Sequence, residues 1–314
     1  MANPVLSVRK LGKDYGARTA VASLDLDVLR GEILGLLGPT GAGKTTTISM
    51  ACGVVTPSRG SVEIGGISLA KSPYAAKRKL GLVPQELAVY EELSSHQNLA
   101  YFGALYGLSG DTLAKRIRWA LGVVGLEDRA REPVKGFSGG MKRRLNIACG
   151  LVHEPEVLVL DEPTVGVDPQ SRNYIFETVR KLRDQGTTVV YTSHYMEEVE
   201  ALCDRVAIMD AGAIVALGTI GELVSKYAGK GVELELAGNV EAAITAMSAH
   251  GSVEREGTSL RVVPTGALAP VIAAIEAAGA TIAKIESRQA NLETAFLSLT
   301  GKALRDAAEG KGAA

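Results

Sequence analysis

The chain has 314 residues, of which 46% are hydrophobic and 22% are charged, a composition typical of a globular protein with a sizeable core. Its length favours one large domain and a second, small one. The formal net charge of −1 argues against nucleic acid and against an anionic membrane surface as partners attracted by bulk charge.

The cysteines and the apolar runs bear on the compartment. Cys52, Cys149 and Cys203 lie far apart, with neither the spacing of a metal site nor that of a disulfide framework. The first residues lack the apolar core of a signal peptide, and no apolar run approaches the length that crosses a bilayer. We therefore expect a cytoplasmic protein. If it works at a membrane, another chain supplies the spans.

In the first two thirds of the chain, strands alternate with helices. Short strands and turns are expected up to about Val28, and the region from Tyr90 to Asp128 is expected to be mostly helical. Further strands are expected at residues 32–37, 61–64, 157–160 and 187–192, and a helix is expected at residues 45–53. This order predicts an α/β fold with a parallel sheet, whose ligand lies outside the carboxyl ends of the strands.

The pattern changes after about Tyr227. The elements expected there are a strand at 232–236, a helix at 240–247, a strand pair within 250–263, a helix at 267–278, a strand at 281–286 and a closing helix at 292–299. The β-α-β-β-α-β order predicts a small ferredoxin-like α+β domain. We place the linker at 226–231, so that the two domains cover residues 1–226 and 231–300. Residues 301–314 are small and charged and are expected to be disordered.

A phosphate-binding loop is predicted between the strand at 32–37 and the helix after it. The sequence Gly38-Pro-Thr-Gly-Ala-Gly-Lys-Thr45 fits the pattern GxxxxGK[ST]. The glycines of this pattern let backbone amides wrap phosphates, while Lys44 reaches the β- and γ-phosphates and Thr45 offers its hydroxyl to Mg²⁺. The expected nucleotide-binding residues are Gly38, Pro39, Thr40, Gly41, Ala42, Gly43, Lys44, Thr45 and Thr46.

Four polar residues at strand ends are expected to complete this site. Asp161 ends a buried strand and can hold Mg²⁺, and the adjacent Glu162 can orient a water and accept its proton. His194 follows the next strand and should emerge at the same edge of the sheet. Gln85 closes a short apolar strand and could reach Mg²⁺ or the attacking water.

A second helix start with the character of an anion site lies in Lys135–Arg144, KGFSGGMKRR. Ser138 is a good N-cap, and Gly139 and Gly140 leave the first amides of the helix uncovered, so that an anion can bind there. The same residues also fit a capped helix without a ligand. The motif alone does not decide between the two.

Taken in order, these motifs resemble those of the ATP-binding cassette (ABC) ATPases, over about residues 4–225. The order is phosphate loop, strand-end glutamine, helical insert at about 86–136, SGG helix start, Asp-Glu pair, Val167-Asp168 and strand-end histidine. The resemblance implies a parallel core sheet, an antiparallel β subdomain and a helical subdomain. It also implies Mg²⁺-dependent ATP hydrolysis, in which Glu162, His194, Lys44 and Gln85 take part.

The resemblance assigns the SGG helix start to a partner chain. In ABC ATPases this start binds the γ-phosphate held by a second copy of the domain, so that Ser138, Gly139 and Gly140 would serve the partner's nucleotide in a head-to-tail homodimer. Asp168 would lie at the same seam. Tyr15 matches the aromatic residue that stacks on adenine, although a tyrosine in a turn could equally pack against protein.

The signature departs from the common family form LSGGQ at two positions. Phe137 replaces the leucine, and Met141 replaces the glutamine, whose hydrogen bonds it cannot make. The three basic residues that follow, Lys142 to Arg144, are expected to form a solvated helix face, with pairing across the nucleotide seam as the alternative.

The segment FSGGMKRR and the last helix resemble cassettes of bacterial drug, sodium and lipo-oligosaccharide exporters. By this resemblance the chain is the ATPase of an exporter, held at the inner face of the membrane by a separate polytopic permease, with Glu86–Glu92 as the contact loop. The alternative is a soluble ABC ATPase that remodels a protein complex or assists cofactor assembly. The C-terminal domain could serve docking or dimerisation, which we favour, or bind a regulatory ligand.

Overall fold

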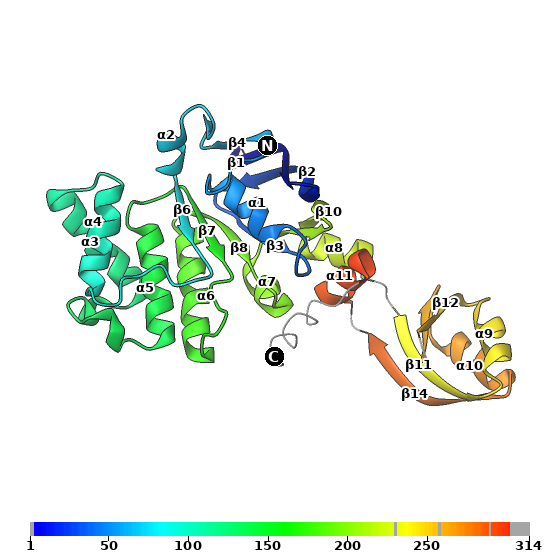
Figure 1. The fold of residues 1–314 in the computed structure, drawn as a ribbon. Helices are drawn as coiled ribbons and strands as arrows, with labels where there is room; N and C mark the ends of the chain where they lie inside the picture. The colour runs from blue at the N-terminus through cyan, green and yellow to red at the C-terminus, as the bar shows by residue number, and fades with distance from the viewer. Residues whose placement is uncertain (1–2, 229–230, 257–258, 289, 302–314) are drawn as a thin grey trace. The chain divides into compact units, whose positions relative to one another are not determined.

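The computed structural model describes residues 3–228, 231–256, 259–288 and 290–301. The chain divides into two compact units (Figure 1), and among the described residues unit 1 ends at Ile220 and unit 2 begins at Gly221. Residues 229 and 230 of the predicted linker and residues 302–314 of the predicted disordered tail lie outside the described residues.

The larger sheet of unit 1 has six strands. In their order across the sheet they are β10 (Ala213–Thr219), β9 (Arg205–Asp210), β3 (Ile33–Leu37), β8 (Thr188–Thr192), β7 (Val157–Asp161) and β6 (Leu80–Val83). The strands from β9 to β6 are parallel, and β10 is antiparallel to β9. Every residue of β3, β7 and β8 is buried, which explains their unbroken apolar sequences. The predicted α/β sheet is confirmed, and β10 makes it mixed.

An antiparallel sheet forms the second layer of unit 1. Its strands, in order, are β2 (Arg18–Leu29), β1 (Pro4–Tyr15), β4 (Arg59–Ile64) and β5 (Ile67–Ser68). The expectation of short strands in this region is wrong, because β1 and β2 have 12 residues each and their register shifts let pairing continue past irregular positions. The turn between β1 and β2 begins only after Tyr15.

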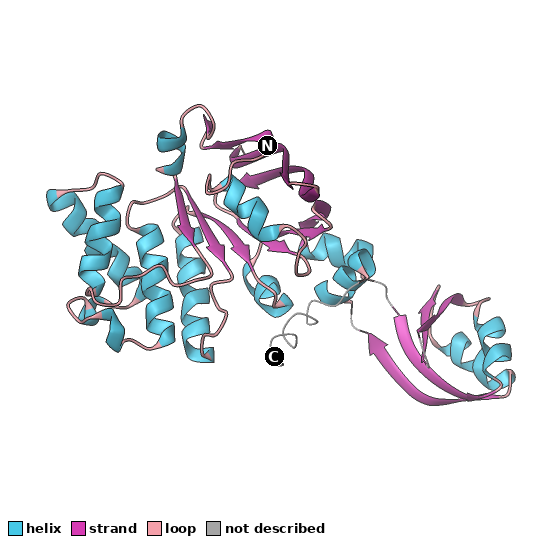
Figure 2. Cartoon of the chain, in the orientation of Figure 1, coloured by secondary structure: helices cyan, strands magenta, loops and turns pink. Residues whose placement is uncertain are grey.

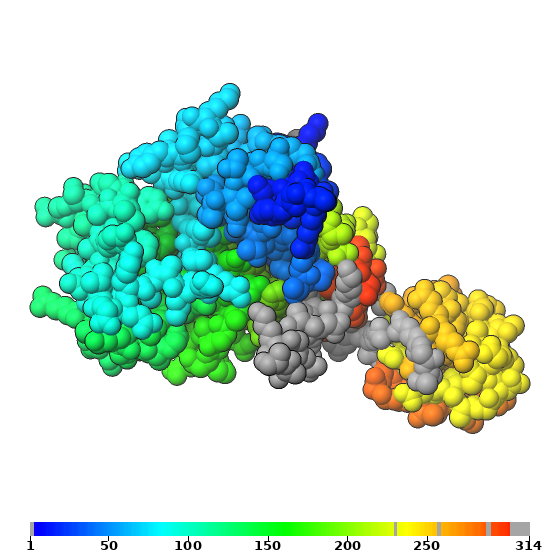
Figure 3. All heavy atoms as spheres, in the orientation of Figure 1, coloured from blue at the N-terminus to red at the C-terminus, as the bar shows by residue number. Residues whose placement is uncertain are grey.

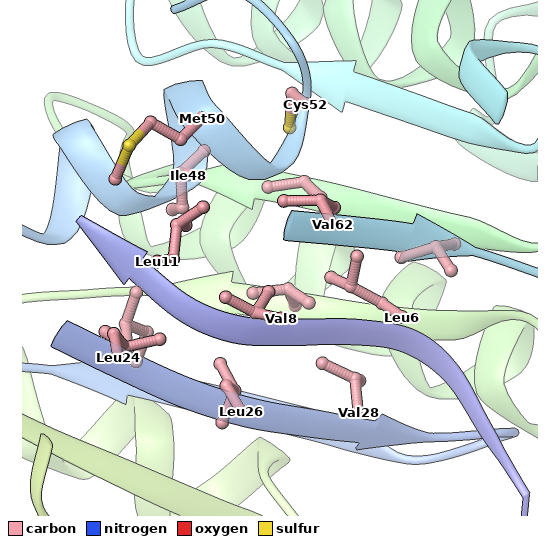
Figure 4. Packing of buried hydrophobic residues seen from close by; sticks show 14 of the residues in the cluster. Leu6, Val8, Leu11, Leu24, Leu26, Val28, Ile48, Met50, Cys52 and Val62 are labelled. Carbon is pink, nitrogen blue, oxygen red and sulfur yellow. The ribbon is translucent and has the colours of Figure 1, made fainter. Parts of the chain in front are cut away.

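The two sheets of unit 1 share a hydrophobic core with helix α1 (Lys44–Ala51). Figure 4 shows side chains of β1, β2, β4 and α1 that point toward one another in this core, among them Leu6, Val8, Leu11, Leu24, Leu26, Val28, Ile48, Met50 and Val62. The core holds α1 against the sheet, and the loop that precedes α1 follows directly from β3. The packing therefore fixes the two ends of the predicted phosphate loop.

Helices α3 (Ser95–Leu105) and α4 (Gly110–Val124) form the helical subdomain, beside α5 (Gly139–Leu151) and α6 (Pro169–Asp184) (Figure 1). Ser94 and Gln97 make a capping box at the start of α3, and Gly125 ends α4 with a φ of 60°. The shorter elements of unit 1 are α2 (Pro73–Lys77), α7 (Met196–Leu202) and two 3-10 turns at Glu127–Arg129 and Val134–Gly136.

Unit 2 begins within α8 (Ile220–Tyr227) and has a sheet and a core of its own. In chain order its further elements are β11 (Gly231–Gly238), α9 (Val240–Met247), β12 (Gly251–Glu256), β13 (Ser259–Pro264), α10 (Ala269–Ala277), β14 (Ala280–Arg288) and α11 (Leu292–Thr300). The four strands pair antiparallel in the order β12-β13-β11-β14, and α9 and α10 lie on one face of this sheet (Figure 2). The core between them includes Leu234, Met247, Val262 and Ile275.

Two further observations concern the cysteines and the helices. Cys52, Cys149 and Cys203 are buried free thiols. Among the residues that the structure describes, no helix is long and apolar enough to cross a membrane.

Candidate functional site

The carboxyl ends of four neighbouring parallel strands carry the residues predicted to bind and hydrolyse a nucleotide. β3 leads into Gly38, β8 ends shortly before His194, β7 ends at Asp161, and β6 ends shortly before Gln85. Because β3, β8, β7 and β6 are adjacent and parallel, these ends lie along one edge of the sheet. The strand order thus gathers side chains that are far apart in the sequence.

The predicted phosphate loop contains glycines whose backbone no other residue adopts easily. Gly41 and Gly43 have φ values of 82° and 99°. A Cβ atom on Gly43 would lie 2.7 Å from the carbonyl oxygen of Ala20, so a larger residue would also collide with the β1–β2 hairpin. Around these glycines, Gly38, Pro39 and Ala42 are buried, Thr46 is half-buried, and Thr40 and Thr45 are exposed.

Lys44 is buried at the end of this loop, with only 6% of its surface exposed. Its Nζ donates hydrogen bonds to the carbonyl oxygens of Gly38, at 2.7 Å, and Pro39, at 3.2 Å. Burial lowers the pKa of Lys44, and the negative charges of Glu162 and Asp161 oppose that change. An anionic ligand in the loop would supply a favourable charge to this desolvated ammonium group.

Two adjacent carboxylates face Lys44 from the end of β7, and both are nearly buried. The Oδ1 atom of Asp161 accepts a hydrogen bond from the Thr192 hydroxyl, whose oxygen accepts one from the backbone N–H of Glu162, each at 2.8 Å. Burial raises the pKa of Asp161 and the charge of Glu162 adds to the rise, while the Thr192 hydrogen bond, Lys44 and His194 lower it. A nearby cation would stabilise the ionised pair.

Glu162 and His194 meet at this edge. The Oε1 atom of Glu162 contacts Nε2 of His194, whose side chain is 31% exposed. Glu162 has a φ of 49°, in the left-handed region that residues other than glycine seldom occupy. The structure therefore brings the predicted base and the predicted strand-end histidine into direct contact, in a backbone conformation that surrounding contacts must hold.

Oxygen donors suited to Mg²⁺ are present at this edge. Thr45 contributes an exposed hydroxyl at the start of α1, Asp161 a carboxylate, and the exposed Gln85 an amide oxygen. Mg²⁺ is bound by oxygen, commonly by one or two carboxylates together with the phosphates of a nucleotide. The raised pKa of Asp161 fits the same ion, because a cation would offset the charge that burial disfavours.

The SGG helix start is capped as predicted, and its two glycines have different surroundings. The Ser138 hydroxyl accepts a hydrogen bond from a backbone N–H in the first turn of α5, at 3.2 Å. A Cβ atom on Gly139 would meet open space, whereas one on Gly140 would lie 2.0 Å from Oγ of Ser171. Ser171 belongs to the start of α6, which Asp168 caps by accepting its N–H at 2.9 Å. Gly139 thus leaves the helix start open, and Gly140 permits close packing.

Tyr15 lies at the end of β1, and 51% of its surface is exposed. The ammonium group of Lys13 lies 5.1 Å from the centre of its ring. The same hairpin carries Ala20, whose carbonyl oxygen adjoins Gly43 of the phosphate loop. Tyr15 is therefore an accessible ring on the hairpin that borders the loop.

The expectation of a solvated face at residues 142–144 is wrong. Lys142 forms an ion pair with Glu91, at 2.7 Å, and its side chain is 17% exposed. Arg144 donates to the carbonyl oxygen of Val124, at 2.9 Å, and lies over the ring of Tyr174. Other elements cover this side of α5, so the basic side chains serve as contacts between elements.

Arg143 and Asn146 are site-supporting residues that sequence reasoning missed. Arg143 is 6% exposed and donates to the carbonyl oxygens of Pro84, at 3.1 Å, and Gln85, at 2.7 Å. The Oδ1 atom of Asn146 accepts from the backbone N–H of Ala88, at 3.1 Å. Their spacing on one side of α5 was the available signal, but nothing in the sequence identified the loop that they would hold.

Comparisons with known proteins agree with this geometry. A family model described as ABC transporter matches residues 21–165. The chain is 43% identical to the linearmycin resistance ATP-binding protein of Bacillus subtilis (strain 168), over 96% of this chain and 100% of that protein. It is 39% identical to the Nod factor export ATP-binding protein I of Ralstonia nicotianae, over 97% of this chain and 96% of that protein. A solved ATP-binding subunit of an ABC transporter superposes with a TM-score of 0.65 and 31% identity, over 71% of this chain and 93% of that chain.

Proposed function

The chain belongs to the ABC transporter family as an ATP-binding and ATP-hydrolysing subunit, and we propose that it drives an exporter whose membrane-spanning part is a separate chain. The observation that carries the proposal is the meeting of the phosphate loop, Asp161, Glu162 and His194 at one edge of a parallel sheet. The relatives described above are a resistance protein and an export protein. They favour an exporter over a soluble ABC ATPase that remodels proteins or assists cofactor assembly.

We propose that ATP occupies the loop at residues 38–46, with its β- and γ-phosphates at Lys44 and its adenine on the ring of Tyr15. The buried ammonium of Lys44 and the exposed ring of Tyr15 support these roles. Thr45, Asp161 and Gln85 would hold Mg²⁺, which when bound offsets the negative charge of the phosphate oxygens.

For hydrolysis we propose that Glu162 orients a water molecule and accepts its proton as the water oxygen bonds to the γ-phosphorus and the bond to ADP breaks. A positioned base of this kind contributes about 10²–10⁴-fold to a rate. His194 contacts the carboxylate of Glu162 and would keep it directed toward the water. Lys44 would stabilise the negative charge of the phosphoryl group in transfer.

A second copy of the chain would complete each site. We propose that Ser138, Gly139 and Gly140 bind the γ-phosphate held by the partner, and that Asp168 lies at the seam between the copies. Open space at Gly139 supports this role, because an anion can approach the first amides of α5 there. The close contact of Gly140 with the start of α6 would let the helix start and Asp168 move together.

The proposed contact with the membrane subunit lies at Glu86–Glu92 and the neighbouring helix α3. Leu87, Tyr90, Tyr101 and Leu105 are all at least 40% exposed, and we call these four residues the contact surface. Figure 3 shows atoms of this part of the chain, in cyan, open on the visible face. Exposed large apolar side chains gathered in one region are typical of protein interaction sites. The chain would therefore lie on the cytoplasmic face of the membrane, held by the permease, and no nucleic acid partner is proposed.

We further propose that residues 1–226 and 231–300 form separate domains and that the second is ferredoxin-like. The β-α-β-β-α-β order, the antiparallel pairing and the strand order β12-β13-β11-β14 support this classification. Docking or dimerisation remains the proposed role of this domain, in preference to binding of a regulatory ligand.

The substitution Glu162→Gln tests the proposed hydrolysis. The variant should bind ATP as the parent chain does and lose about 10²–10⁴-fold in turnover, because an amide cannot accept the proton. Glu177→Gln, at an exposed position on α6, is the matched control and should keep the parent rate. Turnover of Glu162→Gln near the parent rate would remove Glu162 from the role of base.

A further inference from the structure

A further buried carboxylate, outside the residues assigned above, lies next to the catalytic edge. Glu198 belongs to α7, and only 2% of its surface is exposed. Its Oε2 atom accepts three hydrogen bonds, from the hydroxyls of Thr164 at 2.8 Å, Tyr191 at 2.9 Å and Ser193 at 2.7 Å. Burying a carboxylate is costly unless hydrogen bonds compensate it, so this cluster is a built feature of the fold.

The three donors belong to the segments that carry the proposed base and its histidine. Thr164 lies in the turn that begins at Glu162, where the N–H of Val165 donates to the carbonyl oxygen of Glu162. Ser193 immediately precedes His194 in the sequence. One carboxylate oxygen thus joins the turn after β7 to the turn after β8. Each of these turns carries one of the two residues in contact at the site.

The turn that carries His194 is held further by the same cluster. The Ser193 hydroxyl donates to Glu198 and its oxygen accepts from the backbone N–H of Tyr195, at 2.9 Å. The N–H of Glu198 in turn donates to the carbonyl oxygen of Tyr195, at 3.2 Å. The residues on both sides of His194 are therefore tied to Glu198, which limits the positions that the imidazole can take.

The backbone at Glu162 needs such support. Its positive φ of 49° costs of order 1–3 kcal/mol in a residue other than glycine and persists only where surrounding contacts over-determine it. The Thr192 hydroxyl accepts a hydrogen bond from the N–H of Glu162, and Glu198 accepts one from the hydroxyl of Thr164, two residues further along the turn. Loss of the second contact would let the turn relax and the carboxylate of Glu162 move.

We infer that Glu198 is a positioning residue for ATP hydrolysis, which keeps Glu162 and His194 in contact by holding the two turns that carry them. The inference rests on the proposed roles of Glu162 and His194. Within the described part of the chain, the carboxylate of Glu198 accepts hydrogen bonds from Thr164, Tyr191 and Ser193, none of which belongs to the phosphate loop. The lysine of that loop is held by carbonyl oxygens of the loop itself. Its removal should therefore lower the rate of hydrolysis and leave ATP binding unchanged.

The first experiment compares kcat and KM for ATP in Glu198→Ala and Glu198→Gln, with Glu197→Ala, at an exposed position of the same helix, as the matched control. We expect Glu198→Ala to lower kcat about 10- to 100-fold at unchanged KM, because small misplacements of reacting groups have effects of this size. Glu198→Gln keeps an acceptor oxygen and should recover part of the rate. Titration with a fluorescent ATP analogue must give the parent stoichiometry, so that a loss of folded protein does not account for the change.

The second experiment measures turnover in the double variant Glu198→Ala, Glu162→Gln, which also lacks the proposed base. Residues that act as a unit have non-additive effects, so Glu198→Ala should change the residual turnover of Glu162→Gln by less than about twofold. The inference would be overturned by an unchanged kcat in Glu198→Ala. It would also be overturned if Glu198→Ala lowered kcat by the same factor in the parent chain and in Glu162→Gln. If Glu162→Gln alone keeps the parent rate, the proposed hydrolysis fails instead, and the two failures are distinguishable.

Discussion

At the scale of single residues, His153 links protonation to stability. Its Nε2 atom lies 3.1 Å from the carbonyl oxygen of Leu80, and its ring stacks on Tyr106 with the ring centres 3.5 Å apart. Burial is the main cause that lowers the pKa of His153 to about 4; the hydrogen bond to Leu80 opposes the change, and the charge of Arg116 adds to it. The folded chain therefore holds this imidazole neutral at pH values where an unfolded chain protonates it.

The free energy of unfolding should accordingly decrease as the pH falls between the unfolded and the folded pKa of His153. The pKa of an unfolded histidine is about 6.5. The stabilisation that the neutral form of His153 gives to the folded chain is therefore fully present above about pH 6.5 and is lost as the pH falls toward 4. The loss at pH 5 is about 2 kcal/mol by this linkage. Urea unfolding at pH 7.5 and pH 5 measures this loss in the parent chain and in His153→Gln. The free energy of unfolding should decrease less in His153→Gln than in the parent chain. His96→Gln, at an exposed position, is the control; an equal decrease in His153→Gln would contradict the assignment.

At the scale of elements, side chains of α5, the helix that begins at the SGG motif, bind the loop that carries Gln85. Arg143 donates to two carbonyl oxygens of that loop, and Asn146 accepts from its backbone. Burial lowers the pKa of Arg143, which reflects the cost of placing a guanidinium in this position. The contacts would make a movement of α5 and a movement of the Gln85 loop dependent on each other.

Replacing Arg143 by Met should destabilise unit 1 and loosen the loop. Two hydrogen bonds from a charged group are lost and two carbonyl oxygens lose a partner, a cost of about 2–4 kcal/mol in the free energy of unfolding. Amide hydrogen exchange in residues 85–88 should rise more than in β7, which checks that the effect is local. Arg118→Met, at an exposed position of α4, is the control. Unchanged exchange in the loop would contradict this role for Arg143.

The elements also show how far the sequence predicts this molecule. Asp161, His194 and Gln85 could be assigned to one edge because parallel strands align their carboxyl ends, and the loop before α1 has a short local motif. β9 and β10 were not predicted, and β1 and β2 are longer than expected, because pairing through irregular positions depends on tertiary contacts. The contacts of Arg143 and Glu198 join segments far apart in the sequence, and no local pattern reveals such pairs.

At the scale of the whole molecule, each unit has a hydrophobic core of its own. The core of unit 1 includes Leu11 and Met50, and that of unit 2 includes Leu234 and Val262. Separate cores predict separate unfolding transitions, and the nucleotide site lies in only one of the units. A ligand or a core substitution should therefore act on one transition at a time.

Scanning calorimetry can test this independence. ATP without Mg²⁺, at about 100 times its Kd, should stabilise unit 1 by about 2.7 kcal/mol and raise its transition alone. Leu234→Ala should remove about 2–5 kcal/mol from unit 2 and lower its transition alone, because this side chain is fully buried. A single transition that both changes shift would show that the two units unfold as one.

The proposed exporter function requires a separate membrane subunit, and affinity capture tests most directly whether the chain binds one. The Glu162→Gln chain would be captured with ATP from detergent-solubilised membranes of its native cell and its partners identified. A matched variant adds Tyr90→Asp on the contact surface, and a control adds Tyr74→Asp, at an exposed position outside it.

We predict a polytopic membrane protein that is retained with Glu162→Gln and with the Tyr74→Asp control and is lost with Tyr90→Asp. Recovery of soluble proteins alone, or of the homodimer alone, would contradict the exporter assignment while leaving the ATPase in place.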